Sequence, residues 1–458
     1  MPTSSSSLSP PPPKPQGQGQ YSESHSHDPA EQEQHYLETL VESAKPFLSG
    51  DLSPIDPKLP TLISLLRSVG ANECWHKHGT FLSHLTNIHR ILALWHAPSD
   101  VSLCGLFHSA YSNSYVNLAI FDPSTTGRHD VRRHVGAAAE RLIHLFCVVP
   151  RQPLIHDDLL FRYSSESDQE LLHHLGASEA SLRNAKDRGS FDDQEAWRKK
   201  LESVVPKDGV LVKHIKTGED LLLSRRLLAV FLMMTIADFS DQLYGFQDVL
   251  FENLNGRFEF SGNDVAGALW PGDGKPGLWM NLLSRMGAIY HLIVREEEIL
   301  LEKRTREVKE EEEEGFVIEA GGRDEDIELV VPPVFGGCTR VLDAGEQIIA
   351  RDMYWEAVTS RVGLDRAEEL LVGCIAKNPF IGEPHVVLAQ VYLTTGRFEE
   401  GEREAVKGLT LLLEWGSPWD KRMSWEGWIA WARVLLMKAK ERSWPHTPWG
   451  ILNLGLVN

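Results

Sequence analysis

Apolar side chains recur at three- and four-residue intervals in one segment after another between residues 36 and 294. In the segment 80–95, for example, Phe81, Leu85 and Ile88 follow this spacing. The spacing places apolar side chains on one face of a helix. Clusters of Pro, Gly, Asp and Ser separate this segment from its neighbours. Further helices are expected at 101–111, 130–146, 192–204 and 224–243. The sequence therefore predicts an all-α fold.

Changes in composition divide the chain into five predicted parts. The first 35 residues combine a serine run, consecutive prolines and alternating Gln, Gly, Ser and His, which favours disorder. A run of glutamates at 310–314 is typical of a solvated linker. The predicted parts are a disordered tail at 1–35, a helical domain at 36–296, an acidic linker at 297–342, a repeat-like helical region at 343–442 and a C-terminal extension at 443–458.

The repeat-like region is similar to tetratricopeptide proteins. The stretch "GEPHVVLAQVYLTTGRFEEGEREAVKGLTLLLEW" has small and large side chains at the spacing of one tetratricopeptide hairpin. The matching positions are Leu388, Ala389, Tyr392, Gly396, Phe398, Gly401 and Ala405. Upstream, Ala367, Leu371, Cys374 and Pro379 fit the second helix of a preceding repeat. The resemblance implies a tail that packs on neighbouring helices and that can bind a protein partner.

Charge and composition exclude several classes of function. The formal charge of −19 and the lack of a basic stripe argue against nucleic acid as a partner. No apolar run reaches the length of about 18 residues that a membrane span needs. Five scattered cysteines without a CxxC pair indicate a reducing compartment. The Ser-rich N-terminus lacks Arg and carries acidic residues, so the cytosol or the nucleus is favoured over the chloroplast.

Three segments of the helical domain place polar side chains on apolar helical faces. His84 shares a stripe with Phe81 and Ile88, and His108 shares a face with Cys104. Asp238 continues the apolar stripe of its own helix. Each residue alone has a structural explanation, as a hydrogen-bonded core histidine or as an aspartate that caps a helix. Two imidazoles and a carboxylate that converge would instead form a site for a divalent transition metal such as manganese, iron or zinc.

The order of these segments resembles the HD superfamily of metal hydrolases, and within it the hydrolase domain of the stringent-response guanosine tetraphosphate enzymes. In that family a histidine precedes an apolar "LLHD" helix by about two dozen residues, and here His84 precedes His108 of "LFHS" by 24. A later "LADRLHN"-type helix corresponds to "TIADFSDQ", which matches at Ala237 and Asp238. The resemblance covers roughly 70–250. The whole chain is similar to an uncharacterised plant family that joins such a domain to a tetratricopeptide-like tail.

The chain departs from the family pattern in its acidic residues. Ser109 stands in place of the HD aspartate, and Ser112 and Asn113 replace the following Glu-Asp pair. The resemblance therefore implies only His84, His108 and Asp238 as metal ligands. His78, His89 and Asp241 are the nearest candidates to replace the missing carboxylate.

Two functions remain open from the sequence. The first is a metal-dependent phosphohydrolase for a small phosphorylated or nucleotide-like substrate, in which Tyr111 or Asp241 orients the substrate or accepts a proton. The second is a catalytically inactive HD-like scaffold whose tetratricopeptide-like tail binds a protein. Loss of the HD aspartate favours the second function, and retention of three ligand positions favours the first.

Overall fold

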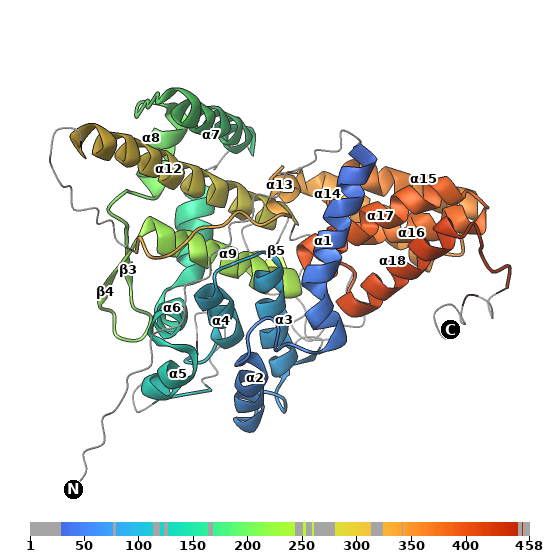
Figure 1. Ribbon diagram of the computed structural model, residues 1–458, viewed down its shortest axis with the longest axis horizontal. Coiled ribbons are helices and arrows are strands. Elements are labelled where there is room, and N and C mark those ends of the chain that lie inside the picture. Colours follow the sequence, from blue (N-terminus) through green and yellow to red (C-terminus); the bar gives the residue numbers. More distant parts are fainter. Residues whose placement is uncertain are drawn as a thin grey trace, which may run out of the picture.

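The computed structural model (Figure 1) describes most of the chain between residues 29 and 451. The described residues are 29–76, 79–112, 120–122, 127–163, 168–242, 251–252, 259–260, 280–312, 324–340, 342–447 and 451. Helices predominate among them, which confirms the predicted all-α class. Most of the predicted disordered tail at 1–35 lies outside the described residues, although a helix begins at Pro29.

The helices follow one another along the chain with three short strand pairs between them. The first helices are α1 (Pro29–Ser49), α2 (Leu59–Ser68), α3 (Phe81–Leu94), α4 (Ser99–Phe107), α5 (Gly127–Val135) and α6 (Ala137–Val148). The π-helical segment η1 (Gln152–Phe161) and the helices α7 (Asp168–Arg188), α8 (Ala196–Val204), α9 (Arg225–Asp241), α12 (Met280–Glu312) and α13 (Phe335–Cys338) follow. The tail contains α14 (Ala344–Thr359), α15 (Leu364–Lys377), α16 (Gly382–Thr394), α17 (Phe398–Trp415) and α18 (Trp425–Lys440).

The described strands form two-stranded antiparallel pairs rather than a larger sheet. They are β1 (Trp75–His76) with β2 (Gly79–Thr80), β3 (Val210–Lys213) with β4 (Asp220–Leu223), and β5 (Phe251–Glu252) with β6 (Glu259–Phe260). Among the described helices, none is both long enough and apolar enough to cross a membrane.

Side-chain caps fix the beginnings of the two helices that matter most for the centre of the molecule. The Thr80 side chain accepts a hydrogen bond from the Ser83 N–H at the start of α3, and Ser224 accepts one from the Leu227 N–H at the start of α9. Each cap satisfies an N–H that the helix itself leaves without a partner, and contributes about 1 kcal/mol. The observed limits of α3 and α9 agree with the predicted segments within two residues.

The helix that we predicted at 130–146 is instead two helices, α5 and α6. Gly136 separates them with a backbone φ of 92°, a conformation that glycine adopts easily and that is incompatible with a continuous helix. The apolar periodicity continues across Gly136 because both helices turn an apolar face to the same core.

The predicted boundary at 296/297 falls inside α12, which continues without a break to Glu312. One cluster of buried apolar side chains contains residues from both sides of that boundary, from Leu59 on α2 to Trp419 beyond α17. The main helical region and the tail therefore share a core.

The tail helices pack in succession at one end of the molecule, and α1 lies against them (Figure 1). Leu37, Leu40 and Ala44 of α1 are buried in the same apolar cluster as residues of α16, α17 and α18. The Tyr36 hydroxyl donates a 2.7 Å hydrogen bond to Glu414 on α17. The N-terminal helix thus packs with the C-terminal tail, although the sequence predicted it as part of the first domain.

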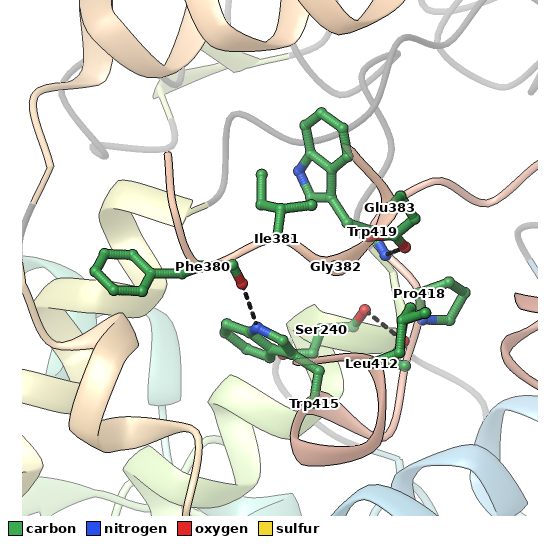
Figure 2. A pocket seen from close by; sticks show the side chains of 10 residues that line it. Ser240, Phe380, Ile381, Gly382, Glu383, Leu412, Trp415, Pro418 and Trp419 are labelled. Carbon is green, nitrogen blue, oxygen red and sulfur yellow. Dashed lines mark hydrogen bonds between the residues drawn. The ribbon is translucent and has the colours of Figure 1, made fainter. Parts of the chain in front are cut away.

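A buried carboxylate joins α16 to the segment after α17. Glu383 is 1% exposed, and one of its oxygens accepts hydrogen bonds from the backbone N–H groups of Trp419 (2.6 Å) and Asp420 (3.1 Å). Figure 2 shows Glu383 beside Trp419, across a small pocket from Trp415. Burial raises the pKa of Glu383 to about 7 because it disfavours the charged carboxylate.

This pKa shift predicts a specific pH dependence of stability. The folded state holds the Glu383 proton more tightly than the unfolded chain, so its contribution to stability falls as the pH rises from about 4.5 to about 7. The variant Glu383→Gln keeps an acceptor oxygen but cannot ionise. We expect the wild type to lose on the order of 2 to 3 kcal/mol relative to this variant between pH 5 and pH 7.5, measured by chemical denaturation.

The variant Glu369→Gln, at an exposed position on α15, is the matched control and should follow the wild type at both pH values. A constant difference between the wild type and Glu383→Gln would show that Glu383 has no raised pKa in the folded protein.

Candidate metal centre

His84 lies on α3, His108 directly follows α4, and Asp238 lies on α9, and these three helices pack tightly. Gly105 on α4 faces α3, and a Cβ at this position would lie 2.5 Å from a Leu92 methyl carbon. The glycine therefore permits the close approach of α3 and α4. Helix α9 is buried along almost its whole length and carries Asp238 in its last turns. The exposed fraction is 4% for His84, 2% for His108 and 6% for Asp238.

The three side chains converge as the sequence predicted. One ligand atom from each of them lies within 4.8 Å of the other two. The Asp238 Oδ1 atom lies 3.3 Å from His84 Nε2 and 4.0 Å from His108 Nε2. The two imidazole rings meet edge to face, with their centroids 5.1 Å apart. Ligand atoms around one transition metal ion lie roughly 3 to 4 Å from each other, so a small contraction would bring this set to a bonding geometry.

The far nitrogen of each imidazole is held by an oxygen. His84 Nδ1 is 2.8 Å from Asp241 Oδ2, and His108 Nδ1 is 2.8 Å from the carbonyl oxygen of Gly105. A carbonyl oxygen only accepts hydrogen bonds, so His108 carries its proton on Nδ1 and its Nε2 lone pair faces Asp238. Asp241 is fixed in turn by the Asn87 amide, which donates a 3.0 Å hydrogen bond to Oδ1. Metal-binding histidines are oriented by such acceptors.

The electrostatics of the cluster distinguish the two histidines. Burial disfavours a charged His84, but its hydrogen bonds to Asp238 and Asp241 outweigh burial and raise its pKa to about 9. Burial lowers the pKa of His108 to about 4, so His108 is neutral at physiological pH. Burial also opposes ionisation of Asp238, and the hydrogen bond from His84 reverses this effect and lowers the pKa of Asp238 below its usual value. The cluster thus holds a carboxylate that needs a cation beside it.

This donor set fits a divalent transition metal. Two imidazole nitrogens and one carboxylate oxygen are the ligands that zinc, iron and manganese sites share. Without a metal, the proton on His84 Nε2 neutralises Asp238, and a metal ion would replace that proton. The geometry therefore identifies a buried group able to hold a metal ion, with the identity of the ion left open.

The other residues that the sequence singled out have different surroundings. Asp241 lies behind His84, as described above. Tyr111 donates a 3.1 Å hydrogen bond to Glu140, a fully buried carboxylate that also accepts hydrogen bonds from Arg128 and Arg132. The pKa of Tyr111 is raised above its usual range, first by burial and then by Glu140. The Tyr111 hydroxyl is thus held by an ion-pair network on α5 and α6.

The three candidates to replace the missing HD aspartate, and the positions that depart from the family pattern, have different surroundings. Asp241 contacts His84 directly, whereas the side chain of His78 lies outside the described residues, as does Asn113. His89 lines a separate pocket beside Asn87. Ser109 is fully buried directly after His108.

The sequence analysis missed two residues of the site. Gln242 caps α9, and its amide donates a 2.5 Å hydrogen bond to Asp238 Oδ1 and lies 3.3 Å from His84 Nε2. Asn87 fixes Asp241. Both could have been found from helical spacing, because Asn87 follows His84 by three positions and Gln242 follows Asp238 by four.

The tail supports the site from outside. The carbonyl oxygen of Ser240, between Asp238 and Asp241 on α9, accepts hydrogen bonds from the Ser417 hydroxyl (3.0 Å) and the Lys421 ammonium (2.9 Å). Figure 2 shows Ser240 in this junction close to Trp415. The segment after α17 thereby fixes the last turn of α9, which carries both carboxylates.

Comparison with known proteins finds one matching family model. Residues 65–151 match a domain of unknown function, DUF6817. The match spans α3 to α6 and includes His84 and His108, whereas Asp238 lies beyond it. No curated protein and no solved structure matches the chain.

The surroundings of Tyr111 predict a structural role for its hydroxyl. The variant Tyr111→Phe should lose about 1.5 kcal/mol of unfolding free energy, because one hydrogen bond to a buried carboxylate is removed. Its affinity for added Mn(II) or Zn(II) should equal that of the wild type. Chemical denaturation and metal titration measure the two quantities. A fall in metal affinity of more than about tenfold would instead place the hydroxyl in the metal centre.

Proposed function

We propose that this chain binds one divalent transition metal ion, manganese, iron or zinc, through His84, His108 and Asp238. The proposal rests on the way in which the side chains of the cluster are arranged. Three side chains from separate helices converge, and the far nitrogen of each imidazole is held by an oxygen. A structural core histidine is also hydrogen-bonded, so the proposal rests on the convergence of three ligand atoms together with these acceptors.

Each residue of the cluster has a distinct task in this proposal. His108 presents a neutral Nε2 because Gly105 holds its Nδ1 proton. His84 is oriented by Asp241, and Asp238 supplies negative charge that burial makes costly without a cation. Gln242 donates to Asp238 and restrains its rotamer. A bound metal ion of this kind lowers the pKa of a coordinated water toward neutrality and makes it a nucleophile.

We further propose that the protein is a divergent HD-type phosphohydrolase that acts on a small phosphorylated or nucleotide-like substrate. The order of the ligands along the chain and the 24 positions between the two histidines support this proposal. The HD-like domain, the tetratricopeptide-like tail and the plant relationship are proposed on the same sequence resemblance.

A second candidate function is an inactive HD-like scaffold that binds a protein through its tail. It is favoured by Ser109, which replaces a metal-binding carboxylate with a weak ligand, and by the engagement of Tyr111 with Glu140. In this function the His84 ion pairs would serve only to keep α3 and α9 together.

Restoring the HD aspartate distinguishes the two functions. In the metal-free state Ser109→Asp should be less stable than the wild type, because it buries an extra carboxylate. Added Mn(II) should recover that stability, and affinity for the ion should rise about tenfold or more. Phosphate release from a panel of nucleotides and sugar phosphates should increase in the Mn(II)-loaded variant and be lost in His108→Ala. Tight metal binding without phosphate release from either protein would favour the scaffold.

A further inference from the structure

A pocket separate from the metal cluster lies against α3, bounded also by the end of α1 and by α2. Its volume is about 190 Å³. A cavity of about 150 Å³ with apolar walls is large enough to hold benzene. The pocket can therefore hold a molecule with one ring and a small substituent.

The pocket has an apolar wall and a few polar groups at one side. The apolar side chains that line it are Phe47, Leu52, Leu59, Ile63 and Leu106. The polar side is formed by α3, on which His89 is only 4% exposed. Among the described residues, no hydrogen-bond partner is found for the His89 ring nitrogens. An occupant of the pocket that hydrogen-bonds to the His89 imidazole therefore gains affinity over one that does not.

The two charged side chains that line the pocket, Arg90 and Glu426, pair with each other, and Asp56 is the acidic residue that acts on His89. Arg90 lines the pocket, but its Nη1 lies 2.7 Å from a Glu426 oxygen and its Nε donates to the carbonyl oxygen of Gly416. Burial lowers the pKa of His89 to about 4, so its imidazole is uncharged at neutral pH. An anionic ligand would have to displace Glu426 from Arg90, whereas an uncharged ligand would leave this ion pair intact.

We propose that this pocket is a binding site for a small uncharged cyclic molecule. The ring packs against the apolar wall, and a hydroxyl or amide group of the ligand hydrogen-bonds to His89. Asn87 lines the same pocket and donates to Asp241, so the ligand sits next to the residue that fixes the carboxylate behind His84. The site itself needs no bound metal, which keeps it independent of the proposed metal function.

The test uses phenol, toluene and benzoate as probes of the metal-free full-length protein. Phenol has a ring and a hydroxyl, toluene lacks the polar group, and benzoate is an anion. Binding is followed by calorimetry and by the methyl resonances of the leucines and isoleucines. We expect saturable binding of phenol, with toluene and benzoate each binding roughly fivefold more weakly or worse.

Three variants locate the binding. His89→Phe keeps a ring but removes the hydrogen bond, and should weaken phenol binding roughly fivefold. Ile63→Trp fills the pocket and should abolish binding. Ile349→Trp makes the same change at an exposed position on α14 and should bind phenol as the wild type does.

Several results would overturn the proposal. Equal binding of toluene and phenol would show that His89 does not hydrogen-bond to the ligand. Tighter binding of benzoate would show that the site prefers anions. Phenol binding that survives in a folded Ile63→Trp protein would place the ligand elsewhere. If no probe binds saturably, the pocket is not a binding site for such molecules. That result would not bear on the proposed metal site.

Discussion

Two carboxylates on an apolar, buried helix determine how the centre of this molecule is arranged. Burying an unpaired carboxylate costs several kcal/mol, so Asp238 and Asp241 on α9 both need partners. His84 lies between them, 3.3 Å from one and 2.8 Å from the other. This contact fixes α3 against α9. The glycine at position 105 then allows α4 to approach α3 and brings His108 to the same point.

The tail is part of this arrangement rather than a separate module. Ser417 and Lys421 hold the carbonyl oxygen of Ser240 on α9, and Arg90 on α3 reaches the carbonyl oxygen of Gly416. Both helices that supply the charged part of the cluster are thus held by the same short segment after α17. A movement of that segment would change the separation of His84 and Asp238 directly, whether the cluster binds a metal ion or serves as a structural ion pair.

The sequence predicted the helices and the apolar faces that carry His84 and Asp238 because both depend on local periodicity, whereas the set of three ligands was implied only by the resemblance to the HD family. Helical spacing places His84 and Asp238 on buried faces without any knowledge of the tertiary fold. The direction of the Tyr111 hydroxyl could not be predicted, because it depends on how α5 and α6 turn at Gly136 and bring Arg128 into reach of Glu140. The single core that continues across the predicted linker could not be predicted either, because it depends on contacts between residues that are far apart in the sequence.

The metal content of the purified protein tests the central claim most directly. The wild type, His108→Ala and the control His89→Ala would be expressed in metal-supplemented medium, purified without chelators and measured by elemental mass spectrometry. We expect about one manganese, iron or zinc ion per chain in the wild type and in the control, and its loss in His108→Ala. The lack of bound metal in all three folded proteins, even after addition of each ion, would contradict it and leave the cluster as a buried ion pair.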